Sequence, residues 1–172
     1  ARLVAALRAS EESLRERLAA TERSRAAGMQ AVTAALAAAR SVADVARVVA
    51  AQGRAAFGAF NAAVALLDAG GRTFRIVAAD GAPPAYLDAW RSFAADAPVP
   101  YADAAATRAP LLIRSRAEYA ARFPVLAPLV ERLGVEATAV LPLVTIDAPG
   151  AAEGSGRVLG VAHFDFDDAA RL

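Results

Sequence analysis

Two segments near the end of the chain indicate the fold, because both are apolar along most of their length: Ala137-Thr-Ala-Val-Leu-Pro-Leu-Val-Thr145 and Val158-Leu-Gly-Val-Ala-His-Phe-Asp-Phe166. A loop rich in Gly, Ser and Glu separates them, so together they predict a β-hairpin. A second pair of apolar runs, residues 61–68 and 73–79, flanks an Asp/Gly turn and predicts another hairpin. A hairpin-connected sheet that is apolar on both faces needs a layer of structure on each side.

Helices that precede the sheet supply one of these layers. The spacing Ser41-x-x-Asp44 is a capping box, and it begins a helix whose apolar residues recur at helical spacing as far as Gly58. Residues 80–135, between the hairpins, have to supply the other layer. We therefore predict an α+β fold with three layers. A central antiparallel sheet of about five or six strands carries the N-terminal helices on one face and a crossover of short helices and loops on the other.

The composition excludes several classes of protein. The formal net charge of 172 residues is +1, which is not the basic surface expected of a nucleic-acid binder. A hydrophobic fraction of 57% is too high for a disordered chain. The longest charge-free apolar stretch, residues 55–67, is shorter than the roughly 20 residues of a membrane span, and we expect no secretory leader. We expect a cytoplasmic domain with neither nucleic acid nor membrane as a partner.

Cysteine and lysine are absent, and His163 is the sole histidine. These absences exclude disulfides, thiolate metal sites, Schiff-base chemistry and any site that needs two imidazoles. No nucleophile and base with an orienting group can be assembled from what remains, so we expect a regulatory domain and no enzyme. We expect no metal site and no cofactor, although His163 could serve as the axial ligand of a haem.

Residues 1–28 predict an exposed helix with charges spaced for ion pairs. Its leucines follow one narrow stripe that fits a heptad and, nearly as well, an eleven-residue repeat. Such a stripe cannot bury itself, so the helix either pairs with a second copy or docks on its own domain. We expect a linker helix at residues 1–28 that forms a parallel homodimer, followed by one domain at residues 29–172. The expected interface residues are Leu3, Leu7, Leu14 and Leu18.

The crossover contains the single Trp and all three Tyr of the chain. It predicts short helices at residues 84–91, 100–107 and 116–123, with a strand at residues 111–113. Short helices and aromatic loops leave a small-molecule pocket more readily than long packed helices do. The alternative is that the aromatic side chains simply fill a second core. Candidate ligand-binding residues are Tyr86, Trp90, Phe93, Tyr101, Asp103, Arg114, Tyr119, Phe123 and His163.

Three polar features have two interpretations each. His163 contacts a ligand if its strand face is the pocket side, and otherwise is a hydrogen-bonded structural residue. Arg114 and Arg116 either hold an anion beside a helix N-terminus or cap that helix in solvent. Asp165, with residues 167–168, indicates either an acidic metal site or a solvated turn, and we expect the turn.

The order of elements resembles a GAF domain. The motifs Ala139-Val-Leu-Pro-Leu-Val144 and Gly156-Arg-Val-Leu-Gly-Val161 are similar to the two central strands of that family. Residues 103–113 are similar to its segment from a helix into the third strand. The resemblance covers about residues 29–168, and the preceding helix resembles a signalling linker. It also implies that the closing helix of the family is cut short at Leu172.

This resemblance implies a sensory function. GAF domains of actinobacterial-type sensor kinases and of SpoIIE-like phosphatases are the most similar kind, and there a separate module carries the catalysis. Members that attach bilins or reduce free methionine sulfoxide use cysteine, and the cyclic-nucleotide type uses an Asn-Lys signature; this sequence has neither. We expect a sensor domain of a multidomain signal-transduction protein, of the two-component kind. It would bind an unidentified small molecule and relay the signal through the dimeric helix. The alternative is a ligand-free dimerisation and relay module.

Overall fold

The computed structural model describes residues 15–17, 19, 30–31, 33–145 and 156–172. The chain divides into two compact units, residues 1–40 and residues 41–172, and each is described by itself. In the first unit, residues 15–17, 19, 30–31 and 33–38 are helical. The expected interface residues Leu3, Leu7, Leu14 and Leu18 lie outside the described residues, as does most of the loop between the last two strands. The leucine-seam dimer and the domain boundary after residue 28 stay predictions.

Helix α2 (Val42–Phe57) begins and ends where the sequence predicts. The Ser41 hydroxyl accepts a hydrogen bond from the backbone N–H of Asp44 at 3.1 Å, which satisfies one of the unpaired donors of the first turn. Gly58 ends the helix with φ of 65°, a left-handed conformation that glycine adopts without steric cost.

Within the described residues, six strands form one antiparallel sheet in the order β3-β2-β1-β6-β5-β4. Both predicted hairpins are confirmed, as β1 pairs with β2 and β5 pairs with β6. The predicted fold class is therefore confirmed. The strands are β1 (Asn61–Leu67), β2 (Thr73–Asp80), β3 (Ser92–Ala94), β4 (Leu111–Ile113), β5 (Ala137–Val144) and β6 (Val158–Phe166).

The crossover is more finely divided than the sequence predicts. The helix expected at residues 84–91 ends at residue 89, and the chain turns directly into strand β3. Pro124 ends helix α5 as expected, but the chain then re-enters a helix that the sequence pattern did not predict. The helical segments of the second unit after α2 are α3 (Pro84–Ala89), α4 (Pro100–Thr107), α5 (Arg116–Arg122), η1 (Pro124–Leu126), α6 (Ala127–Leu133) and η2 (Ala169–Arg171).

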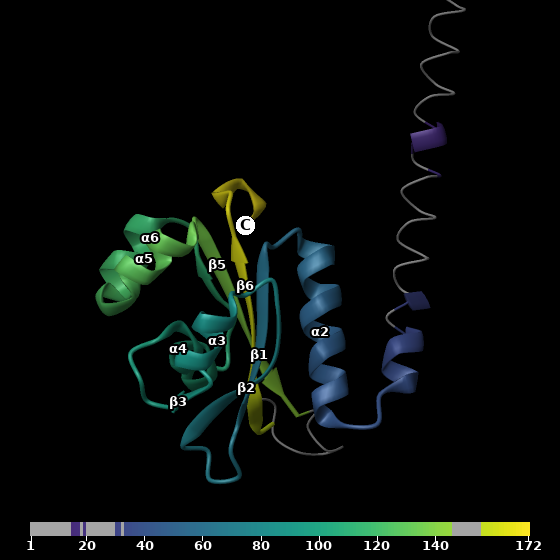
Figure 1. Ribbon diagram of the computed structural model, residues 1–172, viewed down its shortest axis with the longest axis horizontal. Helices are drawn as coiled ribbons and strands as arrows, with labels where there is room; N and C mark the ends of the chain where they lie inside the picture. The colour runs from purple at the N-terminus through teal and green to yellow at the C-terminus, as the bar shows by residue number, and fades with distance from the viewer. Residues whose placement is uncertain (1–14, 18, 20–29, 32, 146–155) are drawn as a thin grey trace, which may run out of the picture. The chain divides into compact units, whose positions relative to one another are not determined.

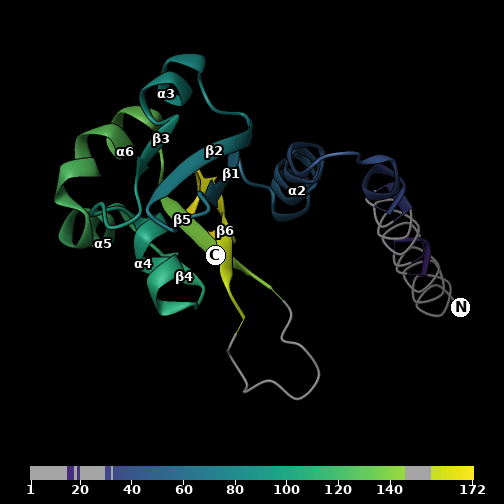
Figure 2. The same ribbon diagram turned by 90° about the horizontal axis from the view of Figure 1, so that it is seen from below.

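Helix α2 and the crossover lie on opposite faces of the sheet (Figures 1 and 2). Alternate residues of β6 serve the two faces: Phe164 packs with the α2 layer, whereas Val161 packs with the crossover. Strand β5 alternates in the same way, since Ala139 faces α2 and Val140 faces the crossover. This parity agrees with the prediction that both faces of the sheet are buried.

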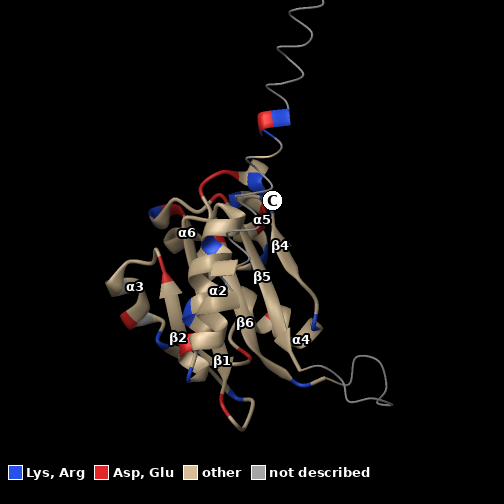
Figure 3. Ribbon diagram, turned by 90° about the vertical axis from the view of Figure 1, so that its right-hand side faces the viewer, with Lys and Arg blue, Asp and Glu red and all other residues tan. Residues whose placement is uncertain are grey.

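Few charged residues lie in the central strands (Figure 3). Strands β1 and β5 contain none, and Asp165 is the one charged residue of β6. Within the described part of the chain, no helix has the length and apolar character that a membrane crossing requires.

Candidate functional site

A cavity of about 30 Å³ lies between the sheet and the crossover. This volume holds about one or two water molecules. Aromatic and aliphatic side chains of the crossover form most of the wall, and β6 contributes two polar side chains. The lining residues are Ile76, Tyr86, Trp90, Phe93, Val99, Pro100, Tyr101, Tyr119, Leu126, Leu129, Val130, Leu133, Val135, His163 and Asp165.

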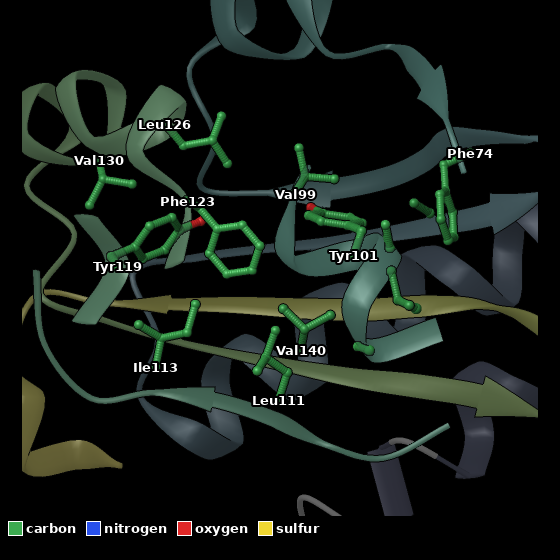
Figure 4. Close-up of a cluster of buried hydrophobic side chains, with 14 of the residues drawn as sticks. Phe74, Val99, Tyr101, Leu111, Ile113, Tyr119, Phe123, Leu126, Val130 and Val140 are labelled. Carbon is green, nitrogen blue, oxygen red and sulfur yellow. The ribbon is translucent and has the colours of Figure 1, made fainter. Parts of the chain in front are cut away.

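Local sequence features bring the aromatic side chains to this wall. Pro100 occupies the first turn of α4, where its missing N–H costs nothing, and it places Tyr101 one residue later over the sheet. The Ser115 hydroxyl caps α5 by accepting from the N–H of Glu118 at 3.1 Å, and Tyr119 follows on the buried side of that helix. In Figure 4 the hydroxyl ends of Tyr101 and Tyr119 point toward each other from α4 and α5.

The rings pack mainly edge to face, a favourable arrangement for aromatic pairs. Phe93 lies centrally among them, with its ring centroid 5.3 Å from that of Tyr101 and 5.8 Å from that of Trp90. Strand pairing holds Phe93 in place, because it is the register partner of the fully buried Phe74. Tyr86 lies on α3 and Trp90 directly follows that helix. Their ring centroids are 6.4 Å apart, and both side chains are half-buried.

A chain of polar side chains runs from α4 into the sheet. The Tyr101 hydroxyl lies 2.9 Å from Nδ1 of His163, and Nε2 of His163 lies 2.9 Å from Oδ1 of Asp165. The second contact is close but poorly aligned for a hydrogen bond. An unprotonated Nε2 would place two hydrogen-bond acceptors, Nε2 itself and Oδ1 of Asp165, against each other. In the neutral imidazole Nε2 therefore carries the proton, and Tyr101 donates to Nδ1.

Two neighbouring strands hold the Asp165 carboxylate from both sides. Asn61 of β1 and Thr138 of β5 are its register partners across β6. The Asn61 side-chain amide donates to Oδ2 at 2.8 Å, and the Thr138 hydroxyl donates to Oδ1 at 2.8 Å. Asn61, Thr138, His163 and Asp165 are all exposed by 4% or less, so this polar cluster belongs to the core.

Burial and these neighbours set the ionisation of the site. Burial alone would raise the pKa of Asp165, but His163 and the hydrogen bonds from Asn61 and Thr138 bring its pKa below the ordinary value of 3.8. Burial, and then the negative charge of Asp165, raise the pKa values of Tyr86 and Tyr119. The cavity therefore has an ionised carboxylate beside neutral phenols at pH 7.

The series Tyr101, His163, Asp165 has the order of a nucleophile, a base and an orienting acid. Two observations argue against that role. Burial raises the pKa of Tyr101 far above its usual value of 10.0, which disfavours the phenolate. In addition, the N–H at Nε2 is not aligned with Asp165. The arrangement is a buried hydrogen-bonded chain, and it lacks the features of an activated nucleophile.

Six of the nine candidate residues line the cavity: Tyr86, Trp90, Phe93, Tyr101, Tyr119 and His163. Phe123 is buried in the same apolar cluster but does not reach the cavity wall. Its ring instead lies 5.8 Å from that of Tyr119, behind the lining residues.

Asp103 and Arg114 do not line the cavity, and their binding of a ligand stays a prediction. Asp103 lies on the outer side of α4, where its carboxylate is 3.5 Å from Arg122. Arg114 is exposed beyond the end of β4. Arg116, the other half of the expected anion site, is bound to Glu136 at 2.8 Å and to the carbonyl of Val135 at 3.0 Å.

The prediction of a solvated turn at Asp165 was wrong. Strand β6 continues to Phe166, so Asp165 stays inside the sheet and a solvated turn begins only with residue 167. The alternation of side-chain direction along β6 already predicted that Asp165 and His163 lie on the same face of the sheet. The partners Asn61 and Thr138 could not be found from the sequence, because they depend on the strand register.

Neither nitrogen of His163 is directed at an open position for a metal, because Tyr101 binds one and Asp165 lies beside the other. Axial ligation of a haem would require the ring to leave both neighbours. Among the described residues, no three acidic or histidine side chains gather closely enough to hold a metal ion.

Solved structures share this fold. The GAF domain of an Acinetobacter phosphoenolpyruvate-protein phosphotransferase aligns with a TM-score of 0.61 at 12% identity, covering 82% of this chain and 75% of that one. Residues 122 to 287 of a methyl-accepting chemotaxis protein align with a TM-score of 0.60 at 18% identity, covering 82% and 81%. A free methionine-R-sulfoxide reductase from Neisseria meningitidis, in complex with its substrate, aligns with a TM-score of 0.59 at 16% identity, covering 82% and 72%.

At these identities the similarity establishes a shared fold, and it confirms at that level the resemblance found in the sequence. No protein-family model matches the sequence, and the search of curated proteins finds no match. Proteins of this fold include part of a chemotaxis protein and a reductase, so the function has to be argued from the site.

Proposed function

We propose that this chain, a GAF domain by its fold, is a sensory domain of a signalling protein that binds a small molecule in the cavity between sheet and crossover. The chemotaxis protein and the phosphotransferase of the same fold support a regulatory function. The observation that carries the proposal is the composition of the cavity wall. Aromatic rings surround two buried polar side chains of β6, His163 and Asp165.

The polar chain supplies a route for the signal. Tyr101 joins α4 to His163 on the cavity face of β6. On the opposite face of the same strand, Phe164 packs against α2, where its ring meets that of Phe57 at 5.1 Å. A ligand that disturbs the Tyr101–His163 hydrogen bond would shift the preferred position of β6 against α2. Helix α2 follows residues 1–40 in the chain, and these include the proposed dimeric helix at residues 1–28.

Binding has to be accompanied by movement, because the cavity holds about one or two water molecules. Helix α3 is the element best suited to move. It has six residues and no side-chain cap, and it carries Tyr86 on the cavity wall. We expect α3 and Trp90 to move outward when a ligand enters, which makes Trp90 a reporter of binding.

The small volume favours a second candidate function, a ligand-free dimerisation and relay module. In this alternative the aromatic side chains are core residues, and the domain transmits strain between neighbouring modules. The two functions differ in one measurable property, which is whether any small molecule stabilises the domain through this cavity.

Thermal melting and Trp90 fluorescence of the purified chain distinguish the two functions. The chain has a single Trp, so the emission reports one position. A sensor is expected to show a melting shift with one class of metabolite, together with a change in Trp90 emission. Substitution of the cavity residue Leu129 by Phe should abolish both responses. The matched control Val125→Phe, at a side chain 78% exposed, should keep them. No change in melting temperature or in Trp90 emission with any class of metabolite would favour the relay module.

The dimer is tested separately by the mass of the chain in solution. Light scattering at micromolar concentration should give the mass of two chains. Replacement of Leu7 and Leu14 by Glu, in the predicted stripe of residues 1–28, should return the mass to that of one chain. A wild-type mass of one chain would contradict the dimer and would leave the cavity proposal unaffected.

A further inference from the structure

We infer that the cavity selects an organic cation, specifically an aromatic or arylalkyl molecule with a primary ammonium or amidinium group. The inference rests on the proposed function and narrows it to one chemical class of ligand. Two properties of the cavity carry it: the charge of its polar wall and the nature of its apolar wall.

The polar part of the cavity wall is acidic, and it has hydrogen-bond acceptor positions that the protein itself does not use. Asp165 lines the cavity, and its carboxylate offers about four acceptor positions. The aligned hydrogen bonds from Asn61 and Thr138 use two of these. They fix the carboxylate in one orientation, whereas Nε2 of His163 approaches without alignment. An ammonium group of a ligand can therefore donate to a carboxylate that is already positioned.

No basic side chain balances this carboxylate at the wall other than His163. Among the described residues, the cavity lining contains no arginine. Three arginines of the crossover are engaged outside it: Arg116 with Glu136, Arg122 with Asp103, and Arg91 with Asp88. An anionic ligand would place a second negative charge beside Asp165 in a buried site, which is strongly unfavourable.

The apolar wall suits the same class of ligand. Tyr86, Trp90, Phe93, Tyr101 and Tyr119 present aromatic rings around the cavity. Aromatic faces attract cations through the ring quadrupole, and they also stack with a second aromatic ring. The negative charge of Asp165 acts across this space, since it contributes, after burial, to raising the pKa values of Tyr86 and Tyr119. A cation is thus favoured by the carboxylate and by the rings together.

Three isosteric probes test the inference on the unaltered chain: benzylamine, benzyl alcohol and benzoate. They share an aromatic ring and differ in the charge of the group attached to it. Melting shifts and Trp90 emission give the affinity of each. We expect benzylamine to bind roughly ten- to a hundredfold more tightly than benzyl alcohol, the range that a hydrogen bond to a charged partner supplies. Benzoate should bind more weakly than either.

The substitution Asp165→Asn should lower the ratio of benzylamine affinity to benzyl alcohol affinity to about one. Asp103→Asn is the matched control, since this carboxylate lies outside the cavity, and it should leave benzylamine binding intact. If Asp165→Asn does not fold, the comparison of the three probes on the unaltered chain decides the question.

Benzoate or benzyl alcohol binding as tightly as benzylamine would overturn the inference and leave the proposed function standing. Failure of all three probes at millimolar concentration would also overturn it. In that case the wider metabolite screen decides separately whether the cavity binds any ligand.

Discussion

The Tyr101 hydroxyl binds Nδ1 of His163 at 2.9 Å, and this hydrogen bond joins helix α4 of the crossover to the central strand β6. Both side chains are almost completely buried. The two residues are 62 positions apart in the sequence, so the bond closes a long loop around the cavity. The bond therefore connects the crossover to the sheet beside the cavity.

The substitution Tyr101→Phe removes the hydroxyl and keeps the ring. It leaves Nδ1 of His163 buried without a partner, which should lower the free energy of unfolding by about 1–3 kcal/mol. Urea unfolding followed by Trp90 fluorescence measures the change. An unchanged midpoint would show that the hydrogen bond contributes nothing to stability.

Stability should fall at acidic pH because of Asp165. Its pKa is lowered in the folded chain relative to the ordinary 3.8, so the ionised carboxylate stabilises the folded state more than the protonated carboxyl does. This contribution is fully present above the ordinary pKa, and it is lost as the pH falls below 3.8 through the folded-state pKa. The free energy of unfolding should therefore drop between about pH 5 and pH 2. In Asp165→Asn the drop should be shallower, and an equal slope in both proteins would contradict the assignment.

Gly160 should be intolerant of any side chain. A Cβ there would lie 2.1 Å from the carbonyl oxygen of Ala65 on the neighbouring strand, and backbone cannot move aside as a side chain does. Gly160→Ala should destabilise the domain by about 3 kcal/mol or more, or prevent folding. Gly70→Ala is the control, because its nearest contact is the flexible Arg72 side chain at 3.4 Å. Circular dichroism during thermal melting compares the two, and equal melting temperatures would refute the predicted clash.

Leu126 and Val125 are adjacent residues with opposite exposure. Leu126 is 8% exposed and lines the cavity, so Leu126→Ala should cost about 2–5 kcal/mol of unfolding free energy. Val125 is 78% exposed, so Val125→Ala should change the free energy by about 0.5 kcal/mol or less. Urea midpoints of the two variants check both values. A similar cost for the two would mean that the crossover is packed differently.

The fold was predictable where the signals are local. Ser41, Asp44 and Gly58 gave the limits of α2 through the chemistry of helix ends. The apolar runs of β5 and β6 gave the central hairpin and the parity of its faces. Strand β3 was not predictable in this way, because three residues are too few to reveal an alternation and their position depends on pairing with β2.

The site was predictable in part for a related reason. Most aromatic residues of the crossover face the cavity because the alanine-rich elements around them leave space that large side chains fill. The role of Asp165 depended on knowing that Asn61 and Thr138 are its register partners, which only the assembled sheet reveals. Asp103 and Arg114 carried suitable chemistry, but they lie where the crossover turns outward.

A sensory domain of this kind receives a small molecule in the cavity between sheet and crossover. A crystal structure of the chain with the compound that most raises its melting temperature would show where that compound binds. We predict that the compound lies between Asp165 and the rings of Tyr86 and Trp90, with α3 displaced outward and the cavity well above its present 30 Å³ or so. A compound bound elsewhere, with the cavity unchanged, would contradict binding in the cavity and favour the relay module.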